Sequence, residues 1–231
     1  MAEANAGKAL TVEIEGTKYS RIPIRTHVVM PGDDLDTFIR EYATDVVAPG
    51  DIFFVTEKIV AITQGRSYLV EDIKPRRLAL FLSKFGVRTP YGIGLGMPET
   101  MEMALRECGT IRILFAAGVS AVTKAFGRKG DFYRIAGDKA RAIDGPTDGT
   151  IPPYNKAVVL GPERPREVAR HLKEMLGGSA EVAVVDINDL GGNILGSTLD
   201  KPTEKRLVAI LKDNPLGQGH ESTPLGVVRV V

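Results

Sequence analysis

Oxygen-bearing side chains follow a predicted buried strand in the last third of this 231-residue chain. The segment EVAVVDIND ends in Asp186, Asn188 and Asp189. Side chains at the carboxyl end of a buried strand lie in the crevice where α/β sheets bind ligands. Two carboxylates and an amide suit a hard cation such as Mg²⁺, which prefers oxygen ligands. Because Gly191 and Gly192 follow, and Asp and Asn are favoured in turns, a simple turn is the competing interpretation.

Asp144 occupies a similar position in the segment KARAIDGPTDG. It ends an apolar stretch and precedes a Gly-Pro pair. It is therefore either an Asx-type turn residue or a ligand presented at a strand end, and the sequence favours neither interpretation.

A glycine-rich loop precedes the last predicted strand. The segment NPLGQGHESTP, residues 214–224, places Gln218, His220 and Glu221 among two glycines. Glycine lets a backbone approach a phosphate closely, which a side chain would obstruct. Prolines towards both ends limit the freedom of the loop. The segment is consistent with a turn into the strand and with a ligand-binding loop.

Histidine and cysteine give little support for a transition-metal site. None of the three histidines forms a His-x-x-x-His zinc pair. His27 interrupts an apolar strand, so we expect a hydrogen-bonded core residue; His171 lies in a predicted helix, where we expect an exposed side chain. The single cysteine, Cys108, excludes an internal disulfide and a cysteine-rich zinc site, and we interpret it as a buried thiol.

The composition is that of a globular protein, with 43% hydrophobic and 26% charged residues. The formal net charge of +1 provides no overall field that would recruit nucleic acid or an anionic membrane. No segment approaches the roughly 20 apolar residues that span a bilayer. We therefore expect a cytoplasmic protein with neither nucleic-acid nor membrane partners.

Hydrophobic periodicity predicts the elements that position these residues. After a flexible N-terminal tail (residues 1–9), alternating apolar residues predict strands over residues 10–15 and 19–29. The segment PGDDLDTFIREYA predicts a helix capped by Asp33 or Asp34. The segment DIFFVTEKIVAITQGR then predicts a strand followed by a short helical turn.

The middle and the end of the chain differ in pattern. From Pro75 the apolar residues have helical spacing, and DFYRIAG with KARAID predicts a hairpin; the last third has β-α-β-α-β order. We predict an α+β fold with two subdomains and mixed β-sheets. Residues 10–74 and 153–231 form an α/β subdomain, and residues 75–152 form a helical insert with a β-hairpin.

Five segments, in this order, resemble one protein family: PGDDL, PGDIFFVTEKIVAITQGR, the strand-end Asp144, VVDIND and NPLGQGHESTPLGVVRV. The family is the coenzyme F420-0:L-glutamate ligases, or gamma-glutamyl ligases. The resemblance covers most of the chain from about Ile22 and is closest to the shorter bacterial ligase-like members.

The resemblance implies an α+β fold of two subdomains, the first of which holds nucleotide and metal, and a homodimer. It implies a ligase that joins L-glutamate to a small-molecule carboxylate, the deazaflavin precursor of coenzyme F420. It also implies GTP, or ATP, as co-substrate and Mg²⁺ or Mn²⁺ as metal.

This chemistry accounts for the residue types. A carboxylate is a poor electrophile, so the reaction first phosphorylates it, and the glutamate amine then attacks the acyl phosphate. Triphosphate and carboxylate repel each other, and metal ions held by protein carboxylates offset the repulsion. Acidic residues at several strand ends and glycine turns are what such a site requires.

The resemblance assigns site residues by position, but no catalytic residue. Its metal ligands fall on Asp144, on Asp186 or Asp189, and on Gln218 and Glu221. The nucleotide-contacting positions lie before the PGDDL helix, in the VVDIND turn and in the glycine loop. They are Thr26, His27, Val28, Val29, Asn188, Gly217, Gly219, His220 and Ser222.

The chain departs from the family pattern in three places. Ile62 stands where the family commonly has a second lysine, DLGGNILG lacks an arginine, and Gln218 replaces a glutamate. These changes alter the charge around a triphosphate, and Lys58 and Arg66 are the cations that could compensate as nucleotide contacts. The alternatives are the same fold acting on a different carboxylate, or a non-catalytic nucleotide- and metal-binding protein.

Overall fold

The computed structural model describes residues 3–86, 94–128, 130–188, 191–217 and 220–231. The chain divides into two compact units. Unit 1 comprises Met1–Gly65 and Pro162–Val231, and unit 2 comprises Arg66–Gly161. Each unit builds a hydrophobic core of its own.

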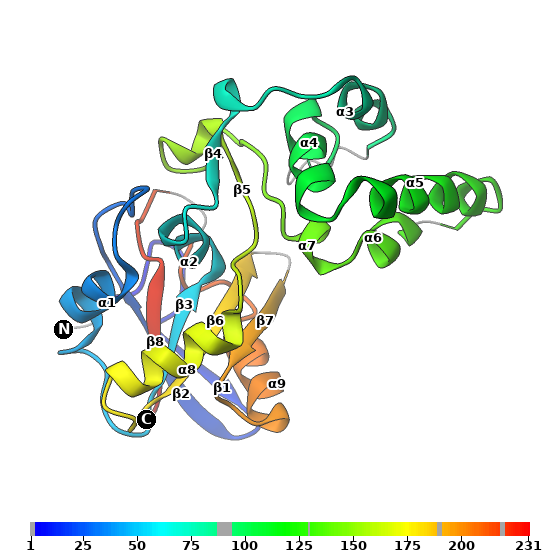
Figure 1. The fold of residues 1–231 in the computed structure, drawn as a ribbon. Coiled ribbons are helices and arrows are strands. Elements are labelled where there is room, and N and C mark those ends of the chain that lie inside the picture. Colours follow the sequence, from blue (N-terminus) through cyan, green and yellow to red (C-terminus); the bar gives the residue numbers. More distant parts are fainter. Residues whose placement is uncertain (1–2, 87–93, 129, 189–190, 218–219) are drawn as a thin grey trace. The chain divides into compact units, whose positions relative to one another are not determined.

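Unit 1 is built on a six-stranded sheet in the order β1-β2-β8-β3-β6-β7 (Figure 1). β3 and β6 run parallel, whereas the other neighbouring pairs are antiparallel. The first and the last third of the chain thus share one mixed sheet, and the predicted α+β class is confirmed. The strands are β1 (Thr11–Ile14), β2 (Thr17–Ile24), β3 (Ile52–Thr56), β6 (Glu181–Asn188), β7 (Gly191–Ser197) and β8 (Leu225–Val230).

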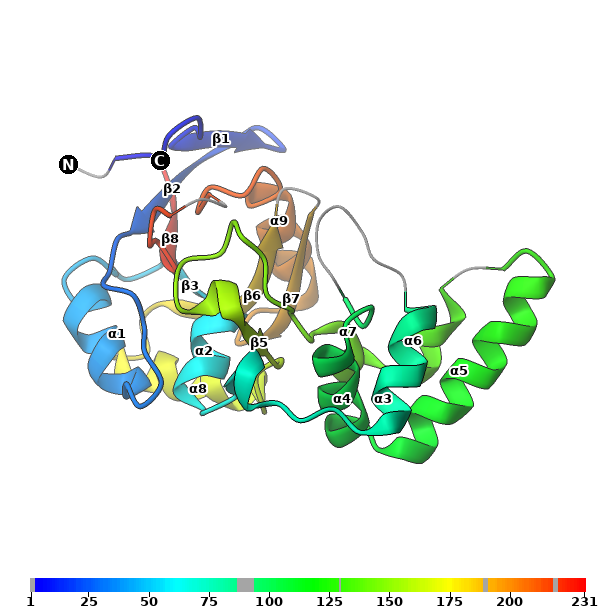
Figure 2. The same ribbon diagram turned by 90° about the horizontal axis from the view of Figure 1, so that it is seen from above.

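Helices cover both faces of this sheet (Figure 2). Ala183, Val185 and Ile187 of β6 pack with Leu207 of α9 in one core cluster. Because side chains alternate along a strand, the intervening residues of β6 face the other side, where α2 and α8 lie. The helices of unit 1 are α1 (Leu35–Ala43), α2 (Glu57–Thr63), α8 (Pro165–Met175) and α9 (Lys201–Ile210).

The start of α1 confirms the prediction from the sequence. Asp34 is the N-cap, and its Oδ1 accepts hydrogen bonds from the Thr37 amide at 2.9 Å and the Thr37 hydroxyl at 2.8 Å. The cap satisfies an amide that the first turn leaves without a partner inside the helix. Phe38 and Ile39, on the apolar face of the helix, are buried as their spacing predicts.

The sequence analysis assigned no element to the segment that forms strand β7. Residues 191–197 form a strand antiparallel to β6, although three of the seven are glycine. The reason is tertiary, because a Cβ at Gly196 would lie 2.3 Å from the backbone nitrogen of Arg166 in α8. A glycine that weakens the strand locally here lets α8 approach the sheet closely.

Unit 2 is mostly helical and contains a two-stranded sheet. β5, which lies in a segment that we assigned to the α/β subdomain, pairs with β4 in this unit. Cys108, at the end of α4, is partly buried against the core. The elements are β4 (Ser67–Leu69), η1 (Val70–Asp72), α3 (Arg77–Leu82), η2 (Ser83–Phe85), α4 (Pro98–Glu107), α5 (Thr110–Ala125), α6 (Asp131–Ala136), α7 (Asp138–Arg141), η3 (Tyr154–Lys156) and β5 (Ala157–Val159).

The hairpin predicted for DFYRIAG and KARAID is wrong, because both segments are helical and form α6 and α7. Phe132 and Ala136, four residues apart in α6, both pack in the core of unit 2. Ala140 of α7 is buried in the same core. A spacing of four places side chains on one face of a helix, whereas strand residues on one face are two apart.

No single helix in the described part of the chain is long and apolar enough to cross a membrane. α4 and α5 meet the criteria of length and composition only as a pair, with a bend of 118° between them. In α4 the residues from Thr100 to Leu105 are buried within unit 2.

Glu102 of α4 is a buried carboxylate with two arginine partners. Its side chain is 2% exposed and accepts hydrogen bonds from Nε of Arg76 at 3.0 Å and Nε of Arg106 at 2.8 Å. Burial alone would raise the pKa of this carboxyl, but the two guanidinium groups and the Arg76 amide together hold it below its ordinary value of 4.5.

We expect Glu102→Gln to lower the free energy of unfolding by about 3 kcal/mol at neutral pH, because two guanidinium groups lose their charged partner. A folded-state pKa below the unfolded value gives stability that is present above about pH 4.5 and is lost as the pH falls through the folded pKa. Urea titrations at about pH 7 and pH 3 measure both effects. The exposed Glu71→Gln is the control, and an undiminished difference at the lower pH would contradict the assignment.

Candidate functional site

Four candidate segments meet at one edge of the unit 1 sheet. Leu225, the first residue of β8, pairs with Ile24 at the end of β2 and with Val55 near the end of β3. Thr56, the last residue of β3, pairs with Val185 of β6. The segments after β2, β3 and β6 and the loop before β8 therefore lie at this edge, which we call the site edge.

Hydrogen bonds join three of these segments. The Thr26 amide donates to the Ser222 carbonyl at 2.9 Å, and the Ser222 hydroxyl donates to the Thr26 carbonyl at 3.0 Å. The Thr56 amide donates to the Pro224 carbonyl at 3.0 Å. Thr26 and Ser222, both predicted to contact the nucleotide, thus hold the glycine loop against the segment after β2.

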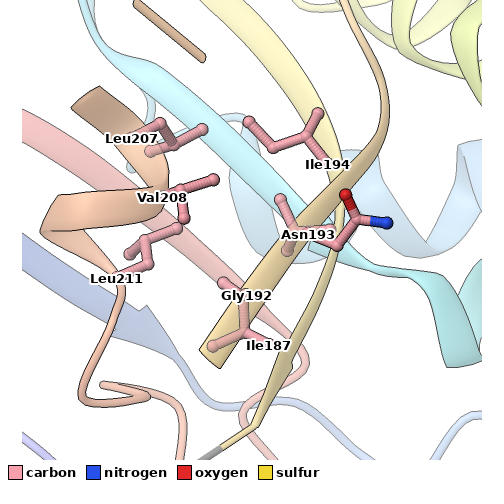
Figure 3. Close-up of a pocket in the computed structure, with 8 residues that line it drawn as sticks. Ile187, Gly192, Asn193, Ile194, Leu207, Val208 and Leu211 are labelled. Carbon is pink, nitrogen blue, oxygen red and sulfur yellow. The ribbon is translucent and has the colours of Figure 1, made fainter. Parts of the chain in front are cut away.

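The oxygen ligands predicted on β6 lie on the sheet face opposite α9. Asp186 and Asn188 alternate with Ile187, which packs toward α9, and both are partly buried. Asn193 of β7 pairs directly with Asp186, and Figure 3 shows its amide directed away from α9. Asp189 lies outside the described residues.

The sequence analysis missed two polar residues at the site edge. Asn193 falls in β7, the strand that the glycine-rich pattern conceals. Glu57 is the first residue of α2 and directly follows Thr56, the last residue of β3. Asp186 likewise follows the buried residues of β6. Its position at the end of a buried strand is the signal that could have identified it.

The α9 side of β6 and β7 carries a shallow apolar hollow (Figure 3). The described residues that line it include no charged side chain, so they offer nothing that would hold a triphosphate. We interpret the hollow as a packing gap of the core. It is lined by Val185, Ile187, Gly192, Asn193, Ile194, Leu207, Val208 and Leu211.

The glycine loop before β8 folds back on itself. Gly217 has a φ of +78°, and a Cβ at this position would lie 2.9 Å from Cδ of Glu221. The Glu221 carboxylate therefore lies over the Gly217 backbone, an approach that a larger residue would obstruct. His220 is exposed, whereas Gln218 and Gly219 lie outside the described residues.

The N-terminal segment, expected as a flexible tail, is tied to this loop at Asn5. Asn5 is 6% exposed, and its Nδ2 donates to the carbonyl oxygens of Pro215 at 3.2 Å and Leu216 at 2.9 Å. It also donates to Oγ1 of Thr223 at 2.8 Å, which in turn donates to the Leu216 carbonyl at 2.7 Å. A buried amide with these partners connects the two ends of the loop.

His27 is a surface residue, so the predicted core position is wrong. Its side chain is 49% exposed, with Nδ1 2.8 Å from the Tyr42 hydroxyl and Nε2 3.5 Å from Oδ2 of Asp33. A hydrogen bond with the Glu41 carboxylate raises the pKa of the Tyr42 hydroxyl above its ordinary value. The imidazole connects α1 to the turn before it.

Val28 and Val29 complete the predicted nucleotide segment. Val29 is 3% exposed, so its side chain belongs to the core, and Val28 is partly buried. A nucleotide contact at these positions would therefore use backbone groups.

The candidate cations differ in their surroundings. Ile62, at the family's lysine position, is 2% exposed in the core. Lys58 lies in the first turn of α2, at the site edge, and is partly buried. Arg66 belongs to unit 2, where its guanidinium donates to Glu107 and to the Gly161 carbonyl, each at 2.7 Å. Arg66 is thus engaged within unit 2.

Asp144 also lies in unit 2. Its amide donates to the Val159 carbonyl at 2.8 Å, and its carbonyl accepts from the Val159 amide at 2.9 Å, which makes an isolated antiparallel bridge. The side chain is partly buried. The other predicted metal ligands belong to unit 1.

The donor atoms at the site edge are oxygens, which suit Mg²⁺ or Mn²⁺. Within the described ranges, no three or more His, Cys, Asp or Glu side chains form a group that could hold a metal ion. A magnesium site here would also draw on amide oxygens, water and the phosphates of a bound nucleotide, as is usual for Mg²⁺.

A family model described as F420-0:Gamma-glutamyl ligase matches residues 23–198 of the chain. The match includes the segment after β2, Asp144 and Asp186, and it ends before the glycine loop. No curated protein matches the chain.

We expect Asn5→Ala to loosen the glycine loop. The loss of a buried donor costs about 1–3 kcal/mol, and the backbone amides of residues 214, 216, 217 and 220–223 should exchange at least tenfold faster with deuterium. Mass spectrometry of the exchanged protein measures this. Glu3→Ala, at an exposed position of the same segment, is the control and should leave the exchange unchanged. Equal protection in the Asn5 variant would refute the role of the amide.

Proposed function

Because the chain belongs to the F420-0:gamma-glutamyl ligase family, we propose that it is a ligase that forms a gamma-glutamyl-type amide bond. It joins a small-molecule carboxylate to L-glutamate, with GTP or ATP as co-substrate and Mg²⁺ or Mn²⁺ as metal. The family match over residues 23–198 is the observation that carries this proposal. The deazaflavin precursor of coenzyme F420 is the first carboxylate to test.

The reaction that we propose has two steps. A carboxylate oxygen of the substrate attacks the γ-phosphorus of the nucleotide, and the nucleoside diphosphate leaves. The glutamate amine then attacks the acyl carbon, loses a proton and expels inorganic phosphate, so one amide, one nucleoside diphosphate and one phosphate form. Bound metal would neutralise charge on the transferring phosphoryl group.

In this proposal the metal ligands in unit 1 are Asp186 and Glu221, with Gln218 and Asp189. Asp186 supports this role by its position at the end of a buried strand, opposite the Asn193 amide. Glu221 supports it because the carboxylate lies over the backbone of Gly217, in the loop that would contact the phosphate. Asp144, in unit 2, is a separate candidate ligand.

The nucleotide would contact the segment after β2 and the glycine loop. Thr26 and Ser222 hold these two segments together, so their contribution is to position backbone amides. Lys58 is the candidate cation for phosphate at the site edge. His27, Val28, Val29, Asn188, Gly217, Gly219 and His220 are the remaining candidate contacts.

A ligase that acts on a different carboxylate is the second candidate. It is favoured by Ile62, which is 2% exposed in the core and supplies no charge where the family commonly has a lysine. Neutral Gln218 changes the charge of the loop further. A smaller or less acidic carboxylate would need fewer cations than the deazaflavin precursor.

We expect the purified protein to release inorganic phosphate from GTP or ATP when magnesium, L-glutamate and the deazaflavin precursor are present. Asp186→Asn should lower the rate by at least about 100-fold, because a ligand that offsets charge in the transition state is lost. Asp138→Asn changes a carboxylate whose side chain is 98% exposed, and is the matched control.

Two further measurements separate the alternatives. Turnover with another carboxylate in place of the precursor would support the second candidate. Calorimetry with nucleotide and magnesium tests binding without turnover. Binding without turnover of any carboxylate would indicate a non-catalytic binding protein. The absence of both binding and turnover would exclude both ligase candidates.

A further inference from the structure

Asn214 begins the glycine loop, and no step of the proposed reaction uses its side chain. The residue is 1% exposed. Its Nδ2 donates a hydrogen bond to the Gly217 carbonyl at 2.9 Å, and its own carbonyl accepts one from the Gly217 amide at 3.1 Å. A single residue therefore holds both backbone groups of Gly217.

Gly217 is the residue over which the Glu221 carboxylate lies. A Cβ at Gly217 would lie 3.0 Å from Oε2 and 3.1 Å from Oε1 of Glu221, so both carboxylate oxygens lie close to this backbone. A shift of the Gly217 backbone would therefore displace the carboxylate. Glu221 is also the only acidic residue in the sequence from Asn214 to Pro224, because Gln218 is neutral. If the loop supplies a carboxylate to a metal ion, it supplies this one.

Two unfavourable features coincide at Asn214. Its φ is +51°, a left-handed conformation that residues other than glycine rarely adopt, although asparagine tolerates it better than most. Its Oδ1 is buried and has no hydrogen-bond partner among the described residues. A buried acceptor without a partner lowers stability. Features of this kind persist where the residue has a task that the surrounding structure supports.

The contact with Gly217 requires a side-chain amide at position 214. An aspartate of the same shape would set an oxygen against the Gly217 carbonyl, and the two acceptors would repel each other. The hydroxyl of a serine is one bond shorter. Glycine would adopt the left-handed φ without cost but would leave the carbonyl without its donor. Asparagine combines the conformation with the donor.

Asn214 is itself held by the end of α9. Its amide donates to the Leu211 carbonyl at 2.9 Å. The neighbouring Asp213 forms an ion pair with Arg21, which is 1% exposed and donates to the Ile210 carbonyl at 3.0 Å. These contacts to a helix and to a buried arginine give Asn214 a fixed place, as a residue that positions another one requires.

We infer that Asn214 is a positioning residue of the glycine loop: its side-chain amide fixes Gly217 and so holds the Glu221 carboxylate where a divalent cation can bind. The inference rests on the proposed function, in which Glu221 is a metal ligand. Asn214 itself contacts neither metal nor nucleotide and acts through Glu221. Groups that orient metal ligands in this way commonly account for an about 10- to 100-fold difference in metal affinity.

Titration of Mn²⁺ into the full chain with GTP present, followed by electron paramagnetic resonance, tests the inference. Asn214→Gly keeps the left-handed φ and removes the side chain, and should raise the Mn²⁺ dissociation constant at least about tenfold. Asn214→Ser should do the same, and Ser222, with a φ of +50°, shows that serine adopts this conformation in the same loop. The matched control is Glu15→Gly, at an exposed residue that also has a φ of +51°, and it should leave the dissociation constant unchanged.

A second background separates positioning from a general loosening of the loop. Glu221→Gln should itself weaken Mn²⁺ binding. Adding Asn214→Gly to it should change the dissociation constant less than about twofold, because no carboxylate remains to be positioned. Glu102→Gln, which destabilises unit 2, is the control for lost stability and should leave Mn²⁺ affinity unchanged.

The outcomes distinguish this inference from the proposed function. Unchanged Mn²⁺ affinity in both Asn214 variants would overturn the inference and leave the proposed function standing. An undiminished loss of affinity when Asn214→Gly is added to Glu221→Gln would do the same. A wild type that binds no Mn²⁺ in the presence of GTP, or a Glu221→Gln variant that binds it as tightly as the wild type, would overturn the metal role of Glu221 and the inference with it.

Discussion

The insertion of β8 between β2 and β3 brings the glycine loop and the segments after β2 and β3 to one edge of the sheet. β8 comes from the end of the chain, whereas its two neighbours precede residue 57. Leu225 pairs with both Ile24 and Val55, so the backbone groups of three strands are satisfied together. Gly226 is required for this packing, because a Cβ there would lie 2.4 Å from the Phe54 ring. Without β8, the segments after β2 and β3 would share no edge.

Buried polar side chains extend this constraint to the N-terminus. Arg21 is 1% exposed, forms an ion pair with Asp213 and donates to the carbonyl of Ile210 at 3.0 Å and that of Ala9 at 2.6 Å. Burial alone would raise the pKa of the Asp213 carboxyl, but Arg21 holds it below its ordinary value. Because buried polar groups need partners, Arg21 binds the segment at Ala9 to the end of α9, and Asn5 binds the N-terminal segment to the glycine loop.

The charges around the site edge bear on the choice of substrate. The family's second lysine position is occupied by Ile62 in the core, and Arg66 is engaged by Glu107 within unit 2. Lys58 remains in the first turn of α2, at the same edge of the sheet as the candidate ligands on β6. A ligase with this arrangement would rely on bound metal, more than on side-chain cations, to offset the charge of a triphosphate.

The sequence by itself determined the features that depend on local pattern. Asp34 caps α1, the strand that ends near Asp186 is buried, and the α+β class follows from the order of elements, because caps and periodicity act over a few residues. The hairpin prediction failed because Phe132 and Ala136 face a core that the sequence does not reveal. β7 was missed because its glycines are needed by α8 and not by the strand. Only the tertiary structure decided that Asn5 contacts the glycine loop and that Leu225 joins Ile24 to Val55, since pairing between distant residues depends on the packing of the whole unit.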